Sequence, residues 1–331
     1  MTTKVFLDYN KPKIRVQEKW GIPWKENHQS IYINRMKIPH FLKKIVSLIL
    51  LFCFCALIGK GWYLIRDGFV LRRVICFETQ PSLELGWNEE AKAVMEQRFT
   101  SFGRGRQSYA FLSEDGNYVI KIPRYDRYRF PLWRKVLNCK FLSLKEKEYL
   151  RKKTGMASLI QSFRLAFDHL KEETAVIAVR FPGNRAKGEF IKIVDRLGRC
   201  YDLPLERTGF VLQYKKEILN SVLQNFLFTS DHEQLAFRLD QILAVIADRA
   251  RKGILCKDDA FMHNFGFDQT KAYQIDVGDF ILSEETNRKL VFEKSVRDNL
   301  ISMRKWIEEI DPDFLPIFDD KVEVIIKSEF L

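Results

Sequence analysis

The sequence GILCKDDAFMHNFGFDQTKAYQIDVGDF, residues 253–280, decides the interpretation of this chain. It follows a long stretch of helical periodicity, and Gly253 stands where a left-handed residue commonly ends a helix. Four residues separate Asp259 from Asn264, and a short predicted hairpin then leads to Asp276 in the tripeptide Asp-Val-Gly. The hairpin is expected to bring Asn264 and Asp276 close together.

These three side chains have the chemistry of a phosphoryl-transfer site. An aspartate beside an acceptor can orient a nucleophile and take its proton, and an Asn with a second Asp supplies the oxygen ligands that Mg²⁺ prefers. A structural alternative is open, in which Asp258 and Asp259 cap a turn, Asn264 caps the hairpin and Asp276 makes a structural contact. Taken alone, the triplet favours that alternative.

A second pattern lies nearer the N-terminus. Gly103-x-Gly105 opens a predicted strand–turn–strand, and Lys121 follows Gly105 by 16 residues on the strand 118–122. A glycine-rich hairpin lets backbone N–H groups approach phosphates, and a lysine on the next strand can reach the same charges. Such a pair is usually only turn chemistry, but its place before the later triplet makes the joint pattern more specific.

The remaining periodicity predicts strands followed mostly by helices. The expected elements, after a linker at 81–86, are a helix at 88–99, strands from 101 to 112 and at 118–122, helices at 132–153 and on to about 170, strands at 175–181, 190–194, 199–203 and 209–214, a long helix from 217 to Gly253, a late hairpin, and helices at 287–309 and 319–330. This order predicts an α+β fold with a sheet-rich first lobe and a helix-rich second lobe.

Residues 102–280 resemble the protein-kinase-like fold, the superfamily shared by protein kinases and small-molecule antibiotic or sugar kinases. Residues 119–122 (VIKI) resemble the strand with the phosphate-binding lysine, and residues 253–264 resemble the catalytic loop with the helix end before it. Asp276-Val-Gly resembles the metal-binding Asp-Phe-Gly. The resemblance implies a two-lobed kinase-like fold with a short second lobe.

It also implies a role for each matching residue. The catalytic residues would be Asp259 and Lys121. The residues that hold ATP would be Gly103, Gly105, Ser108 and Lys121. The ligands of Mg²⁺ would be Asn264 and Asp276. A glutamate of the following helix, Glu146 or Glu148, would pair with Lys121, and residues 211–214 would enter the hinge beside adenine.

The chain departs from this family at three places. Ser108 replaces the third glycine of the phosphate loop, and Lys257-Asp258 replaces the His-Arg before the catalytic aspartate. Only 53 residues follow Gly278, without an Ala-Pro-Glu motif. These departures argue against an ordinary Ser/Thr kinase and leave a compact divergent kinase, a sugar- or lipid-directed kinase, or a pseudokinase.

An apolar segment precedes the kinase-like region. Residues 45–59 carry no charge, and the 21 residues of 45–65 would rise about 31 Å as a helix, close to the thickness of a bilayer core. Lysines flank one end, and Trp62 and Tyr63 lie near the other, where interfacial aromatics are favoured. A buried core helix and a secretory signal counted from Met36 are the alternatives. The lack of a polar face and of a cleavage pattern favours a single transmembrane helix.

The side of the membrane is ambiguous. Five basic residues lie at 25–44 and three at 66–80, which mildly favours a cytoplasmic N-terminus. ATP-dependent chemistry instead requires the large domain in the cytosol. We give slight preference to the cytosolic domain, because the charge difference is small.

Charge and cysteine content exclude several classes. The net charge of +12 is concentrated at residues 1–44, with a net of +7, and at 121–153, with a net of +9. The remainder is slightly acidic, which argues against a uniformly basic nucleic-acid binder and suits an anionic membrane surface as a partner. The six cysteines are scattered without metal-ligand spacing, so neither a disulfide framework nor a zinc site is expected.

The predicted organisation has four parts: a basic segment at 1–44, a transmembrane helix at 45–65, a linker with a helix at 66–98, and a kinase-like domain at 99–331, divided into lobes at 99–214 and 215–331. The first functional hypothesis is a membrane-anchored, ATP-dependent phosphotransferase acting on a hydroxyl of an unidentified acceptor. The alternatives are an inactive pseudokinase or scaffold that binds partners or anionic lipid, and an unrelated α+β protein whose motifs arose by chance.

Overall fold

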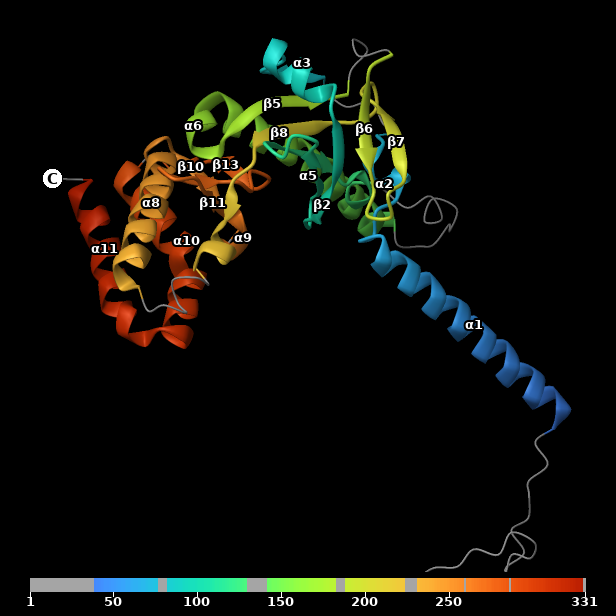
Figure 1. Cartoon of the computed structure of the whole chain (residues 1–331). Helices are drawn as coiled ribbons and strands as arrows, with labels where there is room; N and C mark the ends of the chain where they lie inside the picture. The colour runs from blue at the N-terminus through green and yellow to red at the C-terminus, as the bar shows by residue number, and fades with distance from the viewer. Residues whose placement is uncertain are drawn as a thin grey trace, which may run out of the picture. The chain divides into compact units, whose positions relative to one another are not determined.

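The computed structural model describes residues 39–76, 82–129, 142–182, 188–223, 231–258, 260–285 and 287–329. Within these residues the fold is mixed α+β, with one long apolar helix near the N-terminus, as the element order predicted (Figure 1).

Eight of the described strands form one sheet in the order β1-β5-β8-β4-β3-β2-β6-β7. Neighbouring strands pair antiparallel, except for β2 and β6, which are parallel. The strand bounds are β1 Leu83–Leu85, β2 Arg98–Arg104, β3 Ser108–Ser113, β4 Tyr118–Pro123, β5 Val176–Phe181, β6 Phe190–Val194, β7 Cys200–Pro204 and β8 Phe210–Tyr214. The strands predicted in this region are therefore confirmed.

The β3–β4 hairpin turns at Asp115-Gly116, between the strands predicted at 101–112 and 118–122. Gly116 adopts φ +75°, a left-handed conformation that glycine tolerates. The Asp115 carboxylate accepts hydrogen bonds from Ser113 Oγ at 2.6 Å and from the Asn117 N–H at 3.0 Å. Residues of β3 alternate in burial, so that Tyr109 and Phe111 enter the core under the sheet. The turn and the alternation together fix the register of the strand that carries Lys121.

The predicted linker and helix of residues 66–98 differ from the structure in two respects. Strand β1 lies inside the stretch expected to be a linker, because Leu83 and Leu85 pair with the buried strand β5. Helix α3 (Glu89–Met95) is shorter than the helix predicted at 88–99. The Asn88 side chain caps its N-terminus, and β2 begins at Arg98 with one face buried.

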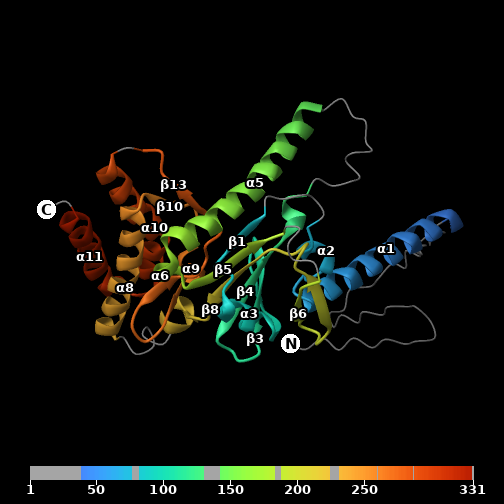
Figure 2. The ribbon, with the colours of Figure 1, turned by 90° about the horizontal axis from the view of Figure 1, so that it is seen from above.

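Helix α5 (Leu142–His169) is continuous, whereas the sequence predicted two helices within 132–170. Residues 130–141 of that prediction lie outside the described residues. A glycine inside a helix costs about 1 kcal/mol, but α5 continues through Gly155 because the next turns are buried against β5 and β13. Figure 2 shows α5 in green along these strands. A short helix, α6 (Lys171–Thr174), follows it.

The C-terminal part of the chain is mostly helical. Its described elements are β9 Glu217–Ile218, α8 His232–Arg251, β10 Ile254–Cys256, α9 Phe261–Asn264, β11 Phe265–Phe267, β12 Ala272–Gln274, β13 Phe280–Leu282, α10 Arg288–Ile310 and α11 Leu315–Ser328. Helices α8, α10 and α11 share one buried apolar cluster with β11. Gly253 ends α8 with φ +70°, which confirms its predicted place.

Two boundaries in this part were wrong. A strand, β9, occupies the start of the helix predicted from Glu217, because it pairs with β11. Helix α11 begins at Leu315 rather than at Asp319, since Pro316 in its first turn favours helix initiation.

Helix α1 (His40–Ile65) is long and apolar enough to cross a membrane, and none of its residues is buried. It begins five residues before the predicted Ile45 and ends where the sequence predicted. Residues 1–38 of the predicted basic segment lie outside the described residues. The turn after α1 leads through α2 (Leu71–Val74) toward β1.

Candidate functional site

Lys121 lies on β4, a central strand of the sheet. It is paired with Ala110 of β3 on one side and Val211 of β8 on the other. Its Nζ donates a hydrogen bond to the carbonyl oxygen of Ile275 at 2.5 Å. The strand lysine is thus held against the residue that precedes Asp276.

The protonation of Lys121 reflects two opposing effects. Burial lowers the pKa of its ammonium group from the ordinary value of 10.5, and the nearby Asp276 carboxylate acts in the opposite direction. An additional anion at this position would stabilise the charged form further. The lysine is therefore suited to meet a phosphate.

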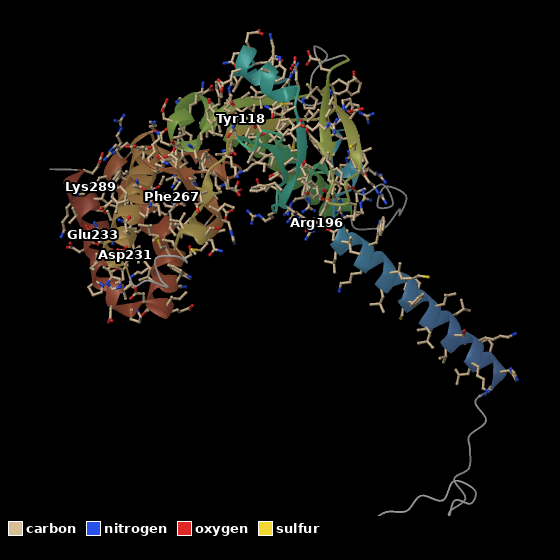
Figure 3. All side chains as sticks on the ribbon, in the orientation of Figure 1. Tyr118, Arg196, Asp231, Glu233, Phe267 and Lys289 are labelled. Atoms are coloured by element: carbon tan, nitrogen blue, oxygen red, sulfur yellow. The ribbon has the colours of Figure 1, made fainter. Side chains whose placement is uncertain are left out.

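The predicted hairpin brings Asn264 to Asp276. Strands β11 and β12 pair from Phe265 with Gln274 to Phe267 with Ala272, and Figure 3 labels Phe267 on this hairpin. The Asn264 backbone oxygen accepts hydrogen bonds from the N–H groups of residues 275 and 276, at 2.7 and 3.3 Å. Asn264 itself is buried. The hairpin register therefore sets where both predicted metal ligands lie.

The Asp276-Val-Gly segment is fixed from its far side by α5. Ser162, fully buried on α5, donates a hydrogen bond to the Val277 carbonyl oxygen and accepts one from the Phe280 N–H, each at 2.6 Å. The Gly278 N–H donates to Asp276 Oδ1 at 3.3 Å. These bonds hold the carboxylate of Asp276 in a short turn rather than in a free loop.

The loop with Gly103, Gly105 and Ser108 joins β2 to β3. The Gly105 N–H donates to the Ser108 carbonyl oxygen at 2.9 Å and closes a turn over Arg106 and Gln107. A Cβ added at Gly103 would meet no atom within 4 Å, and one at Gly105 would make only ordinary contact. Neither glycine has a positive φ. The fold therefore does not require glycine at either position.

Three predicted residues lie wholly or partly outside what the structure describes. Asp259 lies outside the described residues, and so do the side chains of Glu146 and Glu148. Next to Asp259, the Asp258 carboxylate accepts a hydrogen bond from the Ala260 N–H at 3.0 Å. Asp258 thus caps the turn, which is the structural role that the sequence left open for it.

The sequence motifs did not single out Gln213, Gln107 and Asp279, which form hydrogen bonds at the site. Gln213, buried on β8, donates to the Ile275 carbonyl oxygen at 3.2 Å beside Lys121. Gln107 Nε2 donates to Asp279 Oδ2 at 2.7 Å, which ties the β2–β3 turn to the residue after Gly278. Gln213 could have been found as the one polar residue inside the apolar strand FVLQY.

The donor set of the site fits magnesium. Asn264 and Asp276 offer oxygen atoms, the ligand type that a hard cation prefers. Among the described residues there is no group of three or more His, Cys, Asp and Glu that could enclose a metal. Mg²⁺ does not need such a cage, because it usually keeps several waters and binds through one or two protein ligands plus phosphates.

Comparison with known proteins adds little to this geometry. No model of a protein family matches the chain, and no curated protein matches it. Among solved structures, the chain is similar to the crystal structure of WbdD, with 19% sequence identity and a TM-score of 0.32 over 68% of this chain and 48% of that one. The chain spans about half the length of the WbdD chain, and a likeness of this size assigns no activity.

Proposed function

We propose that this chain is a membrane-anchored phosphotransferase of kinase-like fold, which moves the γ-phosphoryl group of ATP to a hydroxyl group. The observation that carries the proposal is the contact between the two halves of the motif. Lys121 Nζ is bonded to the carbonyl of Ile275, so the strand lysine lies beside Asp276 although the two are far apart in the sequence. Chance motifs have no reason to converge in this way.

The arrangement of the elements supports two lobes, 99–214 and 215–331. One buried cluster lies within the sheet, and a separate one joins α8, α10 and α11. A third surrounds α5 and includes Val277 and Phe280. In this proposal α5 is the helix that carries Glu146 or Glu148 as the partner of Lys121, and β8, paired with β4, leads to the hinge.

The reaction assigns a task to each residue. The acceptor hydroxyl oxygen forms a bond to the γ-phosphorus, the bond to the β–γ bridging oxygen breaks, and ADP leaves. Asp259 orients the hydroxyl and takes its proton. Lys121 and the backbone of the Gly103–Ser108 loop hold the phosphates. Mg²⁺, held by Asn264 and Asp276, neutralises phosphate charge when bound.

The experiment for this mechanism is Asp259→Asn. We expect turnover to fall about a hundredfold or more, because a general base is lost, while ATP binding is unchanged. Asp258→Asn is the matched control, because its amide oxygen can still accept from the Ala260 N–H. If Asp259→Asn turns over like the wild type with every acceptor tested, the catalytic assignment fails.

The second candidate is an inactive scaffold that binds partners or anionic lipid. Lys257-Asp258 in place of His-Arg favours it. This candidate predicts that no acceptor is phosphorylated even when nucleotide binds. Nucleotide binding that depends on Asp276, without any turnover in the wild type, would select a pseudokinase.

We also propose that α1 anchors the protein in a membrane as a single-pass helix, with its basic flank against anionic lipid. Deleting residues 45–65 should move the protein to the soluble fraction. If the deletion variant still pellets after a carbonate wash, the anchor is wrong. Protease treatment of intact cells tests the side, and digestion of the large domain from outside would contradict its cytosolic placement.

A further inference from the structure

A basic cavity of about 370 Å³ lies beside the candidate site. Its walls come from the β2–β3 turn, the residues around η1 (Tyr125–Arg127), one face of α5, Lys257 and the segment after Asp276. Five cationic side chains line it, with one carboxylate, that of Asp279: Arg106, Arg127, Arg151, Lys152 and Lys257. The cavity therefore carries a large excess of positive charge.

The single carboxylate does not neutralise these cations. Asp279 Oδ2 already accepts hydrogen bonds from Arg106 Nη2 at 3.1 Å and from Gln107 Nε2 at 2.7 Å. Within the described part of the chain, the side chains of Arg151 and Lys257 form neither an ion pair nor a hydrogen bond. Among the described residues these two cations thus face the cavity without a counter-charge, which is the electrostatic condition for binding an anion.

Neutral groups complete the cavity wall. Burial raises the pKa of Tyr128 to about 12, so its hydroxyl keeps its proton at neutral pH and can donate a hydrogen bond. A Cβ added at Gly155 would lie 3.4 Å from the Tyr128 ring, so this part of α5 packs closely against the ring. The volume suits a small ligand rather than a polypeptide.

The cavity adjoins the residues of the proposed reaction. Lys257 lies two residues before Asp259, and Gly278 and Asp279, which line the cavity, continue directly from Asp276. The Lys257 N–H also donates to the Asp279 carbonyl oxygen at 3.1 Å. A group bound here would lie next to the loop assigned to the acceptor.

A second basic hollow connects this cavity to the end of α1. It is lined by Arg104, Arg124 and Asp67, and it shares Arg106 and Arg127 with the first cavity. Asp67 follows α1 by two residues, and Arg104 donates a hydrogen bond to its carbonyl oxygen at 3.3 Å. A phosphate presented close to the end of the apolar helix would therefore meet a continuous basic surface.

We propose that the cavity binds a phosphate group carried by the acceptor, so that the substrate of this chain is itself a phosphate monoester or a phosphorylated lipid headgroup. Arginine matches phosphate oxygens with paired donors, and the described residues offer the Arg151 side chain neither an ion pair nor a hydrogen bond. The assignment to the acceptor rests on the proposed phosphotransferase function, whereas the phosphate site itself does not.

The test uses the full chain in phosphatidylcholine nanodiscs, with glycerol 3-phosphate as the probe in calorimetry. Arg151→Gln should weaken binding about tenfold or more, since a charge-assisted hydrogen bond is lost. Arg164→Gln is the matched control, because Arg164 lies on the same helix, is exposed and pairs with Asp168 at 3.4 Å. Mg²⁺·ATP binding should be unchanged in both variants.

Equal binding of glycerol 3-phosphate by Arg151→Gln and the wild type would overturn the proposal. A loss of Mg²⁺·ATP affinity in Arg151→Gln as large as its loss of glycerol 3-phosphate affinity would also overturn it, because it would assign the cavity to the nucleotide. Lys257→Gln gives the same test if Arg151→Gln does not fold. Phosphate binding that depends on Arg151, in a protein that binds no ATP, would keep the site and refute the phosphotransferase.

A second experiment distinguishes a phosphate on a lipid headgroup from a phosphate on a soluble molecule. Nanodiscs that contain phosphatidic acid should compete with glycerol 3-phosphate in the wild type if the acceptor is a lipid. Absence of competition, with Arg151-dependent binding retained, assigns the site to a soluble phosphate monoester. Both results support the phosphate site, and competition that persists in Arg151→Gln contradicts it.

Discussion

Two cations of this domain, Lys121 and Arg249, are withdrawn from solvent in different ways. Lys121 donates to the Ile275 carbonyl oxygen and lies beside the Asp276 carboxylate. Arg249 is fully buried in the last turn of α8 and donates to the side chain of Gln274, with two of its nitrogens lacking a hydrogen-bond partner. Burial lowers the pKa of both groups, but only Lys121 has a carboxylate to oppose it.

This difference shows that a buried cation does not define a site by itself. Arg249 lies near the C-terminal end of α8, where a positive charge is favourable, and its guanidinium lies 5.8 Å from the centre of the Phe280 ring. It joins the helix to the hairpin and contacts no candidate ligand. Lys121 instead lies beside the Asp276 carboxylate, where the proposed function places the phosphates of a nucleotide.

The largest effect expected from this comparison is on nucleotide binding. Lys121→Met should reduce the affinity for Mg²⁺·ATP about tenfold or more, because a charged contact to phosphate is lost. The protein should still fold, since Gln213 continues to donate to the Ile275 carbonyl oxygen. Isothermal titration calorimetry with ATP and Mg²⁺ measures the effect.

Arg249→Met is the paired control. A buried charge replaced by an apolar side chain of similar size is often neutral or stabilising, so we expect nucleotide affinity to stay unchanged. If both substitutions reduce ATP affinity equally, the distinction between the two cations is wrong, and the loss with Lys121→Met reflects damage to the fold.

A smaller effect separates the two cations by pH. The folded state holds Lys121 with a lowered pKa, while the unfolded chain has the ordinary value of 10.5. Between these two values the unfolded chain binds more protons, so the free energy of unfolding contributed by Lys121 rises as the pH rises through that window. Urea denaturation across this range measures the effect. The free energy of unfolding of the wild type minus that of Lys121→Met should rise with pH.

The corresponding difference for Arg249→Met should stay flat, because a guanidinium remains protonated throughout this range. A flat difference for Lys121→Met as well would show that the lysine is not desolvated in the folded protein, and the electrostatic contrast between the two cations would be lost.

The sheet could be predicted from the sequence because its signals are local. Asp115-Gly116 fixed one hairpin, and the strand before it alternates in burial with period two. The two-residue strand β9 and strand β1 were missed because their pairing with distant strands, rather than their own pattern, makes them strands. Helix α5 was predicted as two helices with a boundary after residue 153, since the packing that sustains one continuous helix there is tertiary.

The candidate site was predicted only in part. The spacing from Asn264 to Asp276 anticipated their approach through the hairpin, and the order of motifs anticipated Lys121 beside Asp276. The basic cavity was not predicted, because its cations come from segments that meet only in the folded chain. The sequence showed that residues 121–153 are basic. Nothing in this stretch indicated that Arg151 and Lys257 would line the same cavity.

The most direct test of the central claim is thermal unfolding with ATP, in the presence and absence of Mg²⁺, for the wild type, Asp276→Ala and Asp276→Asn. The Asn variant keeps an acceptor for the Gly278 N–H, so its fold should be intact. We predict that Mg²⁺·ATP raises the melting temperature of the wild type, since a ligand of the folded state stabilises it, and that both variants lose the Mg²⁺-dependent part of this rise. A wild type that does not respond to ATP and Mg²⁺, or an Asp276→Asn variant that responds like the wild type, would contradict the account.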